Sequence, residues 1–489
     1  MDNQTIVAPM TPAGVSAVAA IRVSGSRVRD VVTALFGEKQ ASKLVAREAK
    51  LGTARDPKTS QTIDSLLYLF FEGPNSYTGE DVLELYPHGN PLIVRELLQA
   101  IRSVEGVRLA EPGEFTRRAF LNGKMDLIQA ESVADVIHSA NRDELKNAHR
   151  LLAGALSQKV GKLTEQIKDI SARLELDVDF AEEEADPDYS TWQVKIEGIR
   201  NSVEAILKSF RGKANLSRLP LVVFYGAPNA GKSSLVNALL GEDRILVSDI
   251  AGTTRDFVEV RLFLDGGEIR LVDTAGIADK AADALDALSM EKSRQILEEA
   301  DLKILLVDGS AAVSQNGFAT AQQDEAAAVL QDDCAAVPHE SHAERHCEGR
   351  SPEAIQPDMI LYTKSDLLEK AGLHPSCETH GSGLAAQSYL VSAKTGYGLD
   401  VLTAAMNERV FRNQDNSEDL WITSEREKVC LEEALAGIDR ALDLLRTNPA
   451  VELLAFEMQL VRRALQSIVG EISSEDVLQS IFAGFCIGK

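Results

Sequence analysis

The feature that most constrains the fold of this chain is the stretch at 221–236, which reads LVVFYGAPNAGKSSLV. Residues 221–225 are apolar in the pattern of a short buried strand, and apolar residues at helical spacing follow. Between them, residues 226–233 match G-x-x-x-x-G-K-[ST], the phosphate-binding loop. Because backbone N–H groups at a helix N-terminus point toward bound phosphate, this context predicts a nucleotide cradle rather than an ordinary glycine-rich turn. We expect Lys232 to reach the phosphate oxygens and the Ser233 hydroxyl to bind Mg²⁺.

Two segments downstream predict the Mg²⁺ and γ-phosphate contacts of a GTPase. A polar loop at 248–256 precedes a strand-like apolar run, and Thr254 is its expected Mg²⁺ ligand when the γ-phosphate is present. A second apolar run, 269–272, leads into Asp273, whose carboxylate is placed to hold the Mg²⁺ shell. The N–H group of Gly276 can then meet the γ-phosphate.

Two later segments predict contacts to guanine. Asp366 follows an apolar run and can accept two hydrogen bonds, from guanine N1–H and N2–H₂, which adenine does not offer. Residues 391–394, VSAK, supply a last loop that faces guanine O6. Because the segments occur in the order that a GTPase requires, they predict GTP binding through a set of 23 residues. The set is Asn229, Ala230, Gly231, Lys232, Ser233, Ser234, Ser248, Asp249, Ile250, Ala251, Gly252, Thr253, Thr254, Asp273, Thr274, Ala275, Gly276, Thr363, Lys364, Asp366, Ser392, Ala393 and Lys394.

Two positions depart from the common G-protein pattern. Thr363 stands where Asn usually precedes Lys, so an amide that braces the base is missing. We expect guanine preference to persist through Asp366, with lower affinity. Ile277 stands where Ras-type enzymes carry the Gln that orients the attacking water. Hydrolysis must therefore recruit a carboxylate from elsewhere, a monovalent cation or a second subunit.

Charge and composition limit the classes of partner and compartment. The chain of 489 residues has a formal net charge of −24, and residues 1–123 are balanced, with 14 basic and 14 acidic side chains. A polyanion such as RNA is repelled on average, so any nucleic-acid contact must be a local patch or be shared with a partner. An apolar run of membrane-spanning length, a signal peptide and a transit peptide are all missing from the sequence, which predicts a cytoplasmic protein without a membrane partner. Five Cys without framework spacing fit reduced thiols in that compartment.

The pattern of apolar residues along the sequence predicts a helical domain interrupted by an α/β module. Residues 1–123 mix short apolar runs with turns, an α+β pattern. Apolar residues at helical spacing fill 124–217 and 414–489, on either side of an α/β module at 218–413. An insertion at 311–357 has little periodicity, and a metal site is a weaker alternative there than a flexible surface insertion. Its candidate ligands are Cys334, His339, His342, His346 and Cys347.

Several further motifs give the chain a family resemblance. The N-terminal block contains TIVA, IRVSG, YTGED, PGEF and RAFLNGK, and the sequence ends in FCIGK at 485–489. With the GTPase motifs, these resemble the tRNA-modification GTPases called MnmE or TrmE over nearly the whole chain apart from 311–357. The resemblance implies three domains: an α+β N-terminal folate-binding-like and dimerisation domain (1–123), a discontinuous all-α helical domain (124–217 and 414–489), and an inserted α/β P-loop, Ras-like G domain (218–413).

The resemblance also implies how GTP is hydrolysed. Asn229 is similar to an Asn that helps ligate K⁺, and Ser248, Ile250 and Thr253 complete that cation site. The K⁺ would supply positive charge between phosphates as two G domains meet, so dimerisation would activate hydrolysis. The family's water-positioning Glu aligns with Asp286, one methylene shorter, and Asp283 is a rival.

The modification chemistry follows from the same resemblance. Arg22, Glu80, Lys124 and Lys489 are similar to residues that bind 5-formyl- or methylene-tetrahydrofolate, and Cys486 to the family's functional cysteine. The reaction would install an aminomethyl or carboxymethylaminomethyl group on C5 of the wobble uridine of certain tRNAs. The homodimer would work with an FAD-dependent partner, as a heterotetramer, and leave most tRNA binding to that partner.

Two other classes compete with this interpretation. A stand-alone regulatory GTPase in ribosome assembly would share only residues 219–411 and would carry a basic RNA-binding appendage. A structural coiled-coil protein that senses nucleotide would lack the N-terminal block. Neither class explains the N-terminal motifs together with FCIGK.

Overall fold

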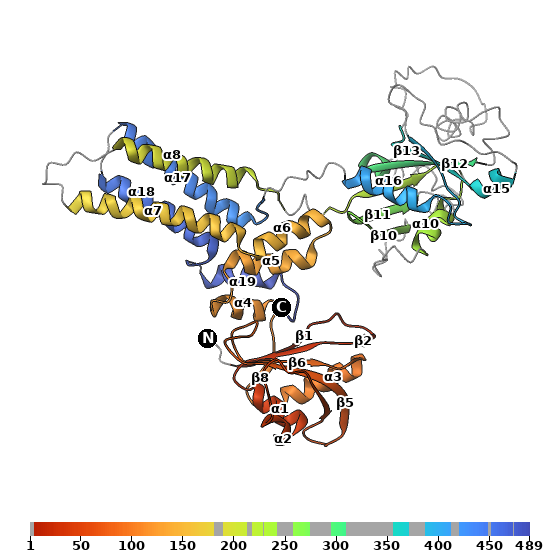
Figure 1. Cartoon of the computed structure of the whole chain (residues 1–489), viewed down its shortest axis with the longest axis horizontal. Helices are drawn as coiled ribbons and strands as arrows, with labels where there is room; N and C mark the ends of the chain where they lie inside the picture. The colour runs from red at the N-terminus through yellow and green to blue at the C-terminus, as the bar shows by residue number, and fades with distance from the viewer. Residues whose placement is uncertain are drawn as a thin grey trace, which may run out of the picture. The chain divides into compact units, whose positions relative to one another are not determined.

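The computed structural model divides the chain into two compact units. The first comprises residues 1–139, 144–213 and 419–489, and the second comprises residues 140–143 and 214–418. Figure 1 colours both along the chain. The structure describes residues 4–179, 189–212, 218–227, 229–241, 258–273, 295–309, 356–370, 387–411, 420–447, 451–472 and 474–489.

The N-terminal part of the first unit is a six-stranded sheet in the order β4-β5-β6-β3-β1-β8. Its pairs are antiparallel except β1 with β8, and β2 and β7 form a separate two-stranded sheet. Alternate residues of β5 are buried, as expected of a sheet with one face on a core. The elements are β1 (Thr5–Pro9), β2 (Ser16–Val18), β3 (Ile21–Ser24), α1 (Val28–Phe36), α2 (Glu38–Ala41), β4 (Lys50–Arg55), β5 (Thr62–Phe71), β6 (Val82–Tyr86), β7 (His88–Gly89), α3 (Pro91–Arg102) and β8 (Val107–Leu109).

The two faces of this sheet pack against different helices. Helices α1 and α3 share one core with alternate strand residues, among them Ile21 and Val23. The other residues of β3, Arg22 and Ser24, therefore face the opposite side. On that side Ile6 and Ala8 pack with Phe115 of α4 (Glu114–Leu121).

The helical part of the first unit is built on four long helices. α17 packs against α8 and α18, and α18 packs against α7, whereas α7 and α8 contact each other much less. One apolar core joins them, and helical spacing of its members explains why these segments fold as amphipathic helices. The helices of this part are α5 (Leu127–His138), α6 (Arg142–Leu152), α7 (Ala155–Asp179), α8 (Tyr189–Lys208), α17 (Glu425–Thr447), α18 (Val451–Val469) and α19 (Glu475–Ala483).

The second unit is an α/β domain with a six-stranded sheet in the order β10-β11-β9-β12-β13-β14. All its pairs are parallel except β10 with β11. Strands β9 and β13 are buried throughout, as expected of a parallel sheet covered on both faces, and two separate apolar cores flank it. The elements are β9 (Leu221–Tyr225), α10 (Lys232–Leu240), β10 (Val258–Leu264), β11 (Gly267–Asp273), β12 (Leu302–Asp308), β13 (Met359–Thr363), α15 (Ser365–Lys370), β14 (Gln387–Leu390) and α16 (Leu399–Phe411).

The predicted fold class, an α+β domain and an all-α domain with an inserted P-loop domain, is confirmed. The domain bounds stay a prediction. One short segment from the predicted helical domain groups with the α/β unit instead. Residues 140–143 fall in the second unit, where Asn141 pairs with Gly267 and Arg142 N–H donates to Gly266 O at 2.9 Å. Within the part of the chain that the structure describes, no helix is both long and apolar enough to cross a membrane.

Candidate functional site

The phosphate loop leaves the C-terminal end of β9 and enters α10. Gly226 has φ +144°, and a Cβ there would lie 2.2 Å from the carbonyl oxygen of Leu306. No other residue fits against β12 at this point. Asn229 and Gly231 have φ of +65° and +89°, so the loop folds back on itself before the helix begins. The backbone geometry explains the glycines at the first and sixth positions of the motif.

The last two residues of the motif, Lys232 and Ser233, follow the loop as the first residues of α10. Lys232 is 4% exposed, and its Nζ donates to Gly226 O and Ala227 O at 2.8 Å each. The Ser233 hydroxyl donates to the Oδ2 atom of Asp273 at 2.6 Å. An alcohol and a buried carboxylate in contact are hard oxygen donors, so their chemistry fits Mg²⁺. The structure thus brings predicted residues from the start of α10 close to Asp273 at the end of β11.

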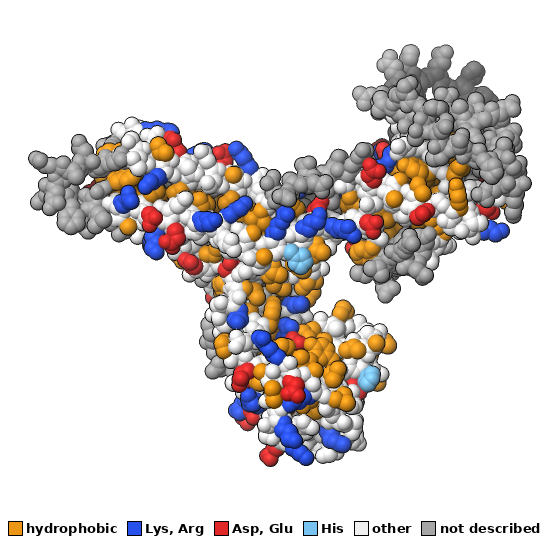
Figure 2. Space-filling model, viewed as in Figure 1, with side chains coloured by type: hydrophobic (Ala, Val, Ile, Leu, Met, Phe, Trp, Pro, Cys, Tyr) orange, Lys and Arg blue, Asp and Glu red, His pale blue; other side chains and the backbone are white. Residues whose placement is uncertain are grey.

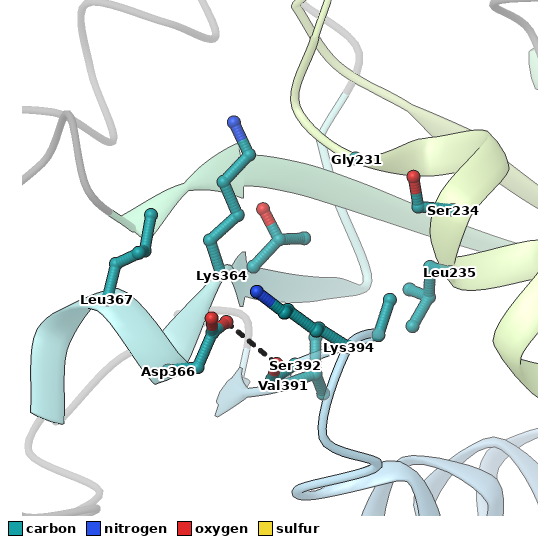
Figure 3. A pocket seen from close by; sticks show the side chains of 11 residues that line it. Gly231, Ser234, Leu235, Lys364, Asp366, Leu367, Val391, Ser392 and Lys394 are labelled. Atoms are coloured by element: carbon teal, nitrogen blue, oxygen red, sulfur yellow. Dashed lines mark hydrogen bonds between the residues drawn. The ribbon is translucent and has the colours of Figure 1, made fainter.

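A cavity of about 360 Å³ lies beside the loop, where the sequence predicts the base. Figure 3 shows Asp366 and Ser392 joined on one side of it, with Gly231 and Leu235 on the other. The Ser392 hydroxyl donates to Asp366 Oδ1 at 2.8 Å, which fixes the carboxylate. The lining of the cavity includes all six predicted base-binding residues, together with Ser234 from α10: Thr363, Lys364, Asp366, Ser392, Ala393 and Lys394.

Thr363 has a contact that the sequence did not predict. Its side chain is buried, and its hydroxyl donates to Ala230 O at 2.6 Å, with Val307 O at 3.2 Å. The hydroxyl therefore ties the end of β13 to the phosphate loop. The sequence suggested only that an amide is missing here, because register between β13 and the loop cannot be read from the chain.

Several predicted residues lie outside the described residues. They are Ser248, Asp249, Ile250, Ala251, Gly252, Thr253, Thr254, Thr274, Ala275, Gly276, Ile277, Asp283 and Asp286, and the Cys and His residues of 311–357. Their roles stay predictions. Among the described residues, no group of three or more His, Cys, Asp or Glu side chains could hold a metal ion.

Three of the candidate cofactor-binding residues, Arg22, Glu80 and Lys489, gather on the face of β3 opposite α1 and α3. Arg22 pairs with Glu84 at 2.9 Å and lies over the ring of Tyr77, 4.8 Å from its centroid. Its Nη1 atom is buried without a hydrogen-bond partner among the described residues. Burial lowers the pKa of Lys489, and the nearby Arg22 guanidinium lowers it further. A buried donor beside an aromatic ring and a second cation fits a ligand with both an anionic and a flat ring portion.

Glu80 reaches the same strand through a short network. Its carboxylate accepts the Ser24 hydroxyl at 2.7 Å and Arg118 Nη1 at 3.1 Å. Arg118 also donates to the buried Glu114 at 2.9 Å. Lys124 Nζ instead donates to Pro74 O at 2.8 Å. Arg22, Lys489 and Glu80 are therefore brought to one face, and Arg118, a member of the RAFLNGK motif, is a positioning residue that sequence reasoning missed.

The C-terminal segment is anchored to this domain by its backbone. Phe115 N–H donates to Lys489 O at 3.2 Å. Gly488 has φ +97°, and a Cβ there would lie 2.2 Å from Pro9 O. The segment therefore enters the domain only with glycine at this position.

Cys486 has a neighbour that the sequence did not predict. The thiol is exposed, and its Sγ atom lies 4.0 Å from Nε2 of His138, at the end of α5. His138 Nδ1 lies 2.9 Å from Ala134 O. Because a carbonyl only accepts, Nδ1 carries a proton, and in the neutral imidazole Nε2 then has a lone pair that can accept from the thiol. The two residues are 348 positions apart, so no sequence spacing could have joined them.

The fold and this geometry define the class: a P-loop GTPase domain inserted into a helical domain that carries an α+β domain. Residues 5–124 match the model of the GTP-binding protein TrmE N-terminus, and residues 127–486 match the MnmE helical domain. The chain is 36% identical to the tRNA modification GTPase MnmE of Dichelobacter nodosus (strain VCS1703A), over 100% of this chain and 99% of that protein. The chain belongs to the MnmE family of tRNA modification GTPases.

Two solved structures were also found to be similar. The G domain of the T. maritima FeoB iron transporter is 22% identical and covers 39% of this chain and 99% of its own, with a TM-score of 0.24. The cytosolic domain of L. pneumophila FeoB is 13% identical and covers 54% of this chain and 93% of its own, with a TM-score of 0.25.

Proposed function

We propose that this GTPase is a homodimer and that it is activated by K⁺ and by contact between its two G domains. Its hydrolysis of GTP needs Mg²⁺. With an FAD-dependent partner, in a heterotetramer, it adds an aminomethyl or carboxymethylaminomethyl group to C5 of the wobble uridine of certain tRNAs. A tetrahydrofolate derivative supplies the one-carbon unit. The observation that carries the proposal is the N-terminal cluster of Arg22, Glu80 and Lys489 beside the Cys486–His138 pair, because a simple GTPase switch needs neither.

At the nucleotide site, each described residue has one task. Lys232 leaves the carbonyl oxygens of its own loop and donates to phosphate oxygens instead. Ser233 and Asp273 would hold Mg²⁺, which would supply positive charge to neutralise the phosphates. Asp366, held by Ser392, accepts the two guanine N–H groups.

The cation dependence rests on the phosphate loop. Asn229 is held at positive φ, which sets the direction of its side chain, and a K⁺ there would stabilise charge between the phosphates. The proposed K⁺ ligands Ser248, Ile250 and Thr253, and the water-positioning Asp286, complete the site by resemblance.

At the modification site, the described residues bind the cofactor and move a proton. Arg22 and Lys489 attract the carboxylates of tetrahydrofolate, and Glu80 accepts N–H groups of its pterin ring. The Cys486 thiol passes its proton to the free Nε2 lone pair of His138, which makes Cys486 a nucleophile.

The GTPase part is tested by exchanging the monovalent cation. We expect strong GTP hydrolysis in K⁺ and slow hydrolysis in Na⁺ at equal ionic strength, with Asn229→Ala slow in both. Light scattering with a transition-state analogue measures whether K⁺ also promotes the dimer of G domains. Equal rates in the two salts would remove the cation role.

The modification part is tested by mass spectrometry of tRNA nucleosides from cells that lack the gene. We expect the modified wobble uridines to disappear and to return with the wild-type gene. Cys486→Ser is expected to restore GTP hydrolysis but not modification, and His138→Asn to lower modification. Cys430→Ser is the matched control, because that thiol is half-buried in the helical core. Unchanged nucleosides in the deletion strain would contradict the proposal.

A further inference from the structure

A trough runs between α7 and α8 in the helical part of the first unit. Two hollows form it, with volumes of about 690 Å³ and 390 Å³. Gln166 of α7 and Ser202 of α8 line both hollows, so the two are one continuous feature. It exists because α7 packs mainly on α18 and α8 mainly on α17, which leaves the two helices apart.

The sides of the trough are basic. In the part of the chain that the structure describes, five exposed cationic side chains line it, and Asp169 is the one acidic side chain in the lining. Among the described residues, an ion pair joins Lys208 to Glu204, while the other four cations have none. The five are Lys159, Lys162, Arg173, Lys195 and Lys208. In a chain with a net charge of −24, this concentration of positive charge is a local exception. Figure 2 shows several Lys and Arg side chains over α7 and α8 on the face in view.

The lining of the trough is partly apolar and partly polar. The floor residues Leu156, Leu163, Ile170 and Ile199 belong to the helical core and are between 1% and 6% exposed, whereas Val194 on α8 is exposed. Gln166, Ser202 and Ser209 lie among the cationic side chains. A partner therefore meets ammonium and guanidinium groups, hydroxyl and amide groups, and some apolar surface.

We propose that this trough, the α7–α8 trough, binds the phosphodiester backbone of tRNA. Lys159 and Arg173 are 14 residues apart on one helix, which spans about 21 Å and is long enough for several consecutive phosphates. Lysines act on phosphate as point charges, so contact here gives affinity and orientation without reading sequence. The proposal rests on tRNA as the substrate in the proposed function, and it assigns to this chain a share of the tRNA contact.

The test is binding of fluorescently labelled tRNA to the full chain over a range of salt concentrations. Lys159→Glu with Lys162→Glu is expected to lower affinity about tenfold near 0.1 M salt and to reduce the slope of log affinity against log salt by about 2. Lys39→Glu with Lys43→Glu, both exposed in the N-terminal domain, makes the same charge change and is expected to leave affinity within about twofold. Circular dichroism reports whether the Lys→Glu charge reversals unfold α7. If they do, the milder Lys→Gln changes at 159 and 162 are used in their place.

Three outcomes overturn the proposal. Unchanged affinity in the folded trough variants removes the site, and equal losses in both pairs reduce it to an effect of net charge. Displacement of tRNA by polyglutamate as readily as by unlabelled tRNA would assign the trough to an acidic protein. The proposed function is tested by a different measurement. If the trough variants lose tRNA binding, GTP hydrolysis is still expected to be intact. Unchanged nucleosides in the deletion strain would contradict tRNA modification, even if tRNA binds the trough.

Discussion

The contact between Thr363 and the phosphate loop predicts a measurable loss of nucleotide affinity. Thr363→Val keeps the shape of the side chain and removes the hydroxyl that donates to Ala230 O at 2.6 Å. Both residues are nearly fully buried, at 4% and 2% exposed, so the carbonyl is left without a donor from β13. An unsatisfied buried group costs about 1–3 kcal/mol. Without this hydrogen bond, the nucleotide itself must order the phosphate loop. The cost is therefore subtracted from the free energy of nucleotide binding.

The expected size follows from that free energy. A loss of about 1–2 kcal/mol in binding corresponds to roughly 5- to 30-fold weaker affinity for GDP. Titration with a fluorescent GDP analogue measures it, and thermal unfolding measures the part that appears as lower stability. Thr363→Ser keeps the hydroxyl and is expected to bind close to wild type.

Ser365 gives the matched control for Thr363. It is 4% exposed, two residues further along, and its hydroxyl has no partner among the described residues. Ser365→Ala therefore removes a buried hydroxyl without breaking a bond, and we expect unchanged or slightly higher stability. If Thr363→Val binds GDP as tightly as wild type and unfolds at the same temperature, the bond to the phosphate loop has no energetic role.

Further predictions concern glycines and one buried acid. Gly226→Ala is expected to abolish GDP binding in the same titration, since its Cβ meets a carbonyl of β12, whereas Gly161→Ala, in open space on α7, is the control and should stabilise slightly. Gly488→Ala should displace the C-terminal segment from Pro9, with loss of tRNA modification but normal GTP hydrolysis. For Glu114, burial raises the carboxyl pKa, but hydrogen bonds from two arginines and a backbone N–H outweigh it, so the pKa is lowered. Its stabilisation is therefore present above the unfolded pKa and lost as the pH falls through the folded pKa. Glu114→Gln should cost about 3 kcal/mol in urea unfolding at pH 7 and less at acidic pH; an equal cost at both would contradict this.

Local features of the nucleotide site could be predicted from the sequence because they are contiguous. The strand before Gly226, the helix after Lys232 and the placement of Asp273 all follow from hydrophobic periodicity and loop chemistry. Parallel strands then bring these loops to one edge of the sheet, so the approximate site follows from the order of the motifs.

Contacts between distant segments could not be predicted in the same way. The bonds of Arg118 to Glu80 and of Thr363 to Ala230 depend on how elements pack, over 38 and 133 residues of chain. The α7–α8 trough is also invisible in the sequence, since it depends on which helices pack together and which stay apart. Charge predicted only that any RNA contact must be a local patch or be shared with a partner.

The anchoring of the C-terminal segment has a consequence for biosynthesis. The N-terminal sheet leaves the ribosome first, yet Lys489 and Gly488, which complete its ligand face, follow the helical and α/β segments. At about 5–20 residues per second, the roughly 360 intervening residues take some 20–70 s to make. During that interval the sheet can fold, but the contacts of Gly488 with Pro9 and of Lys489 with Phe115 are not yet made. A chain whose translation stops early therefore has an N-terminal sheet that lacks these two contacts.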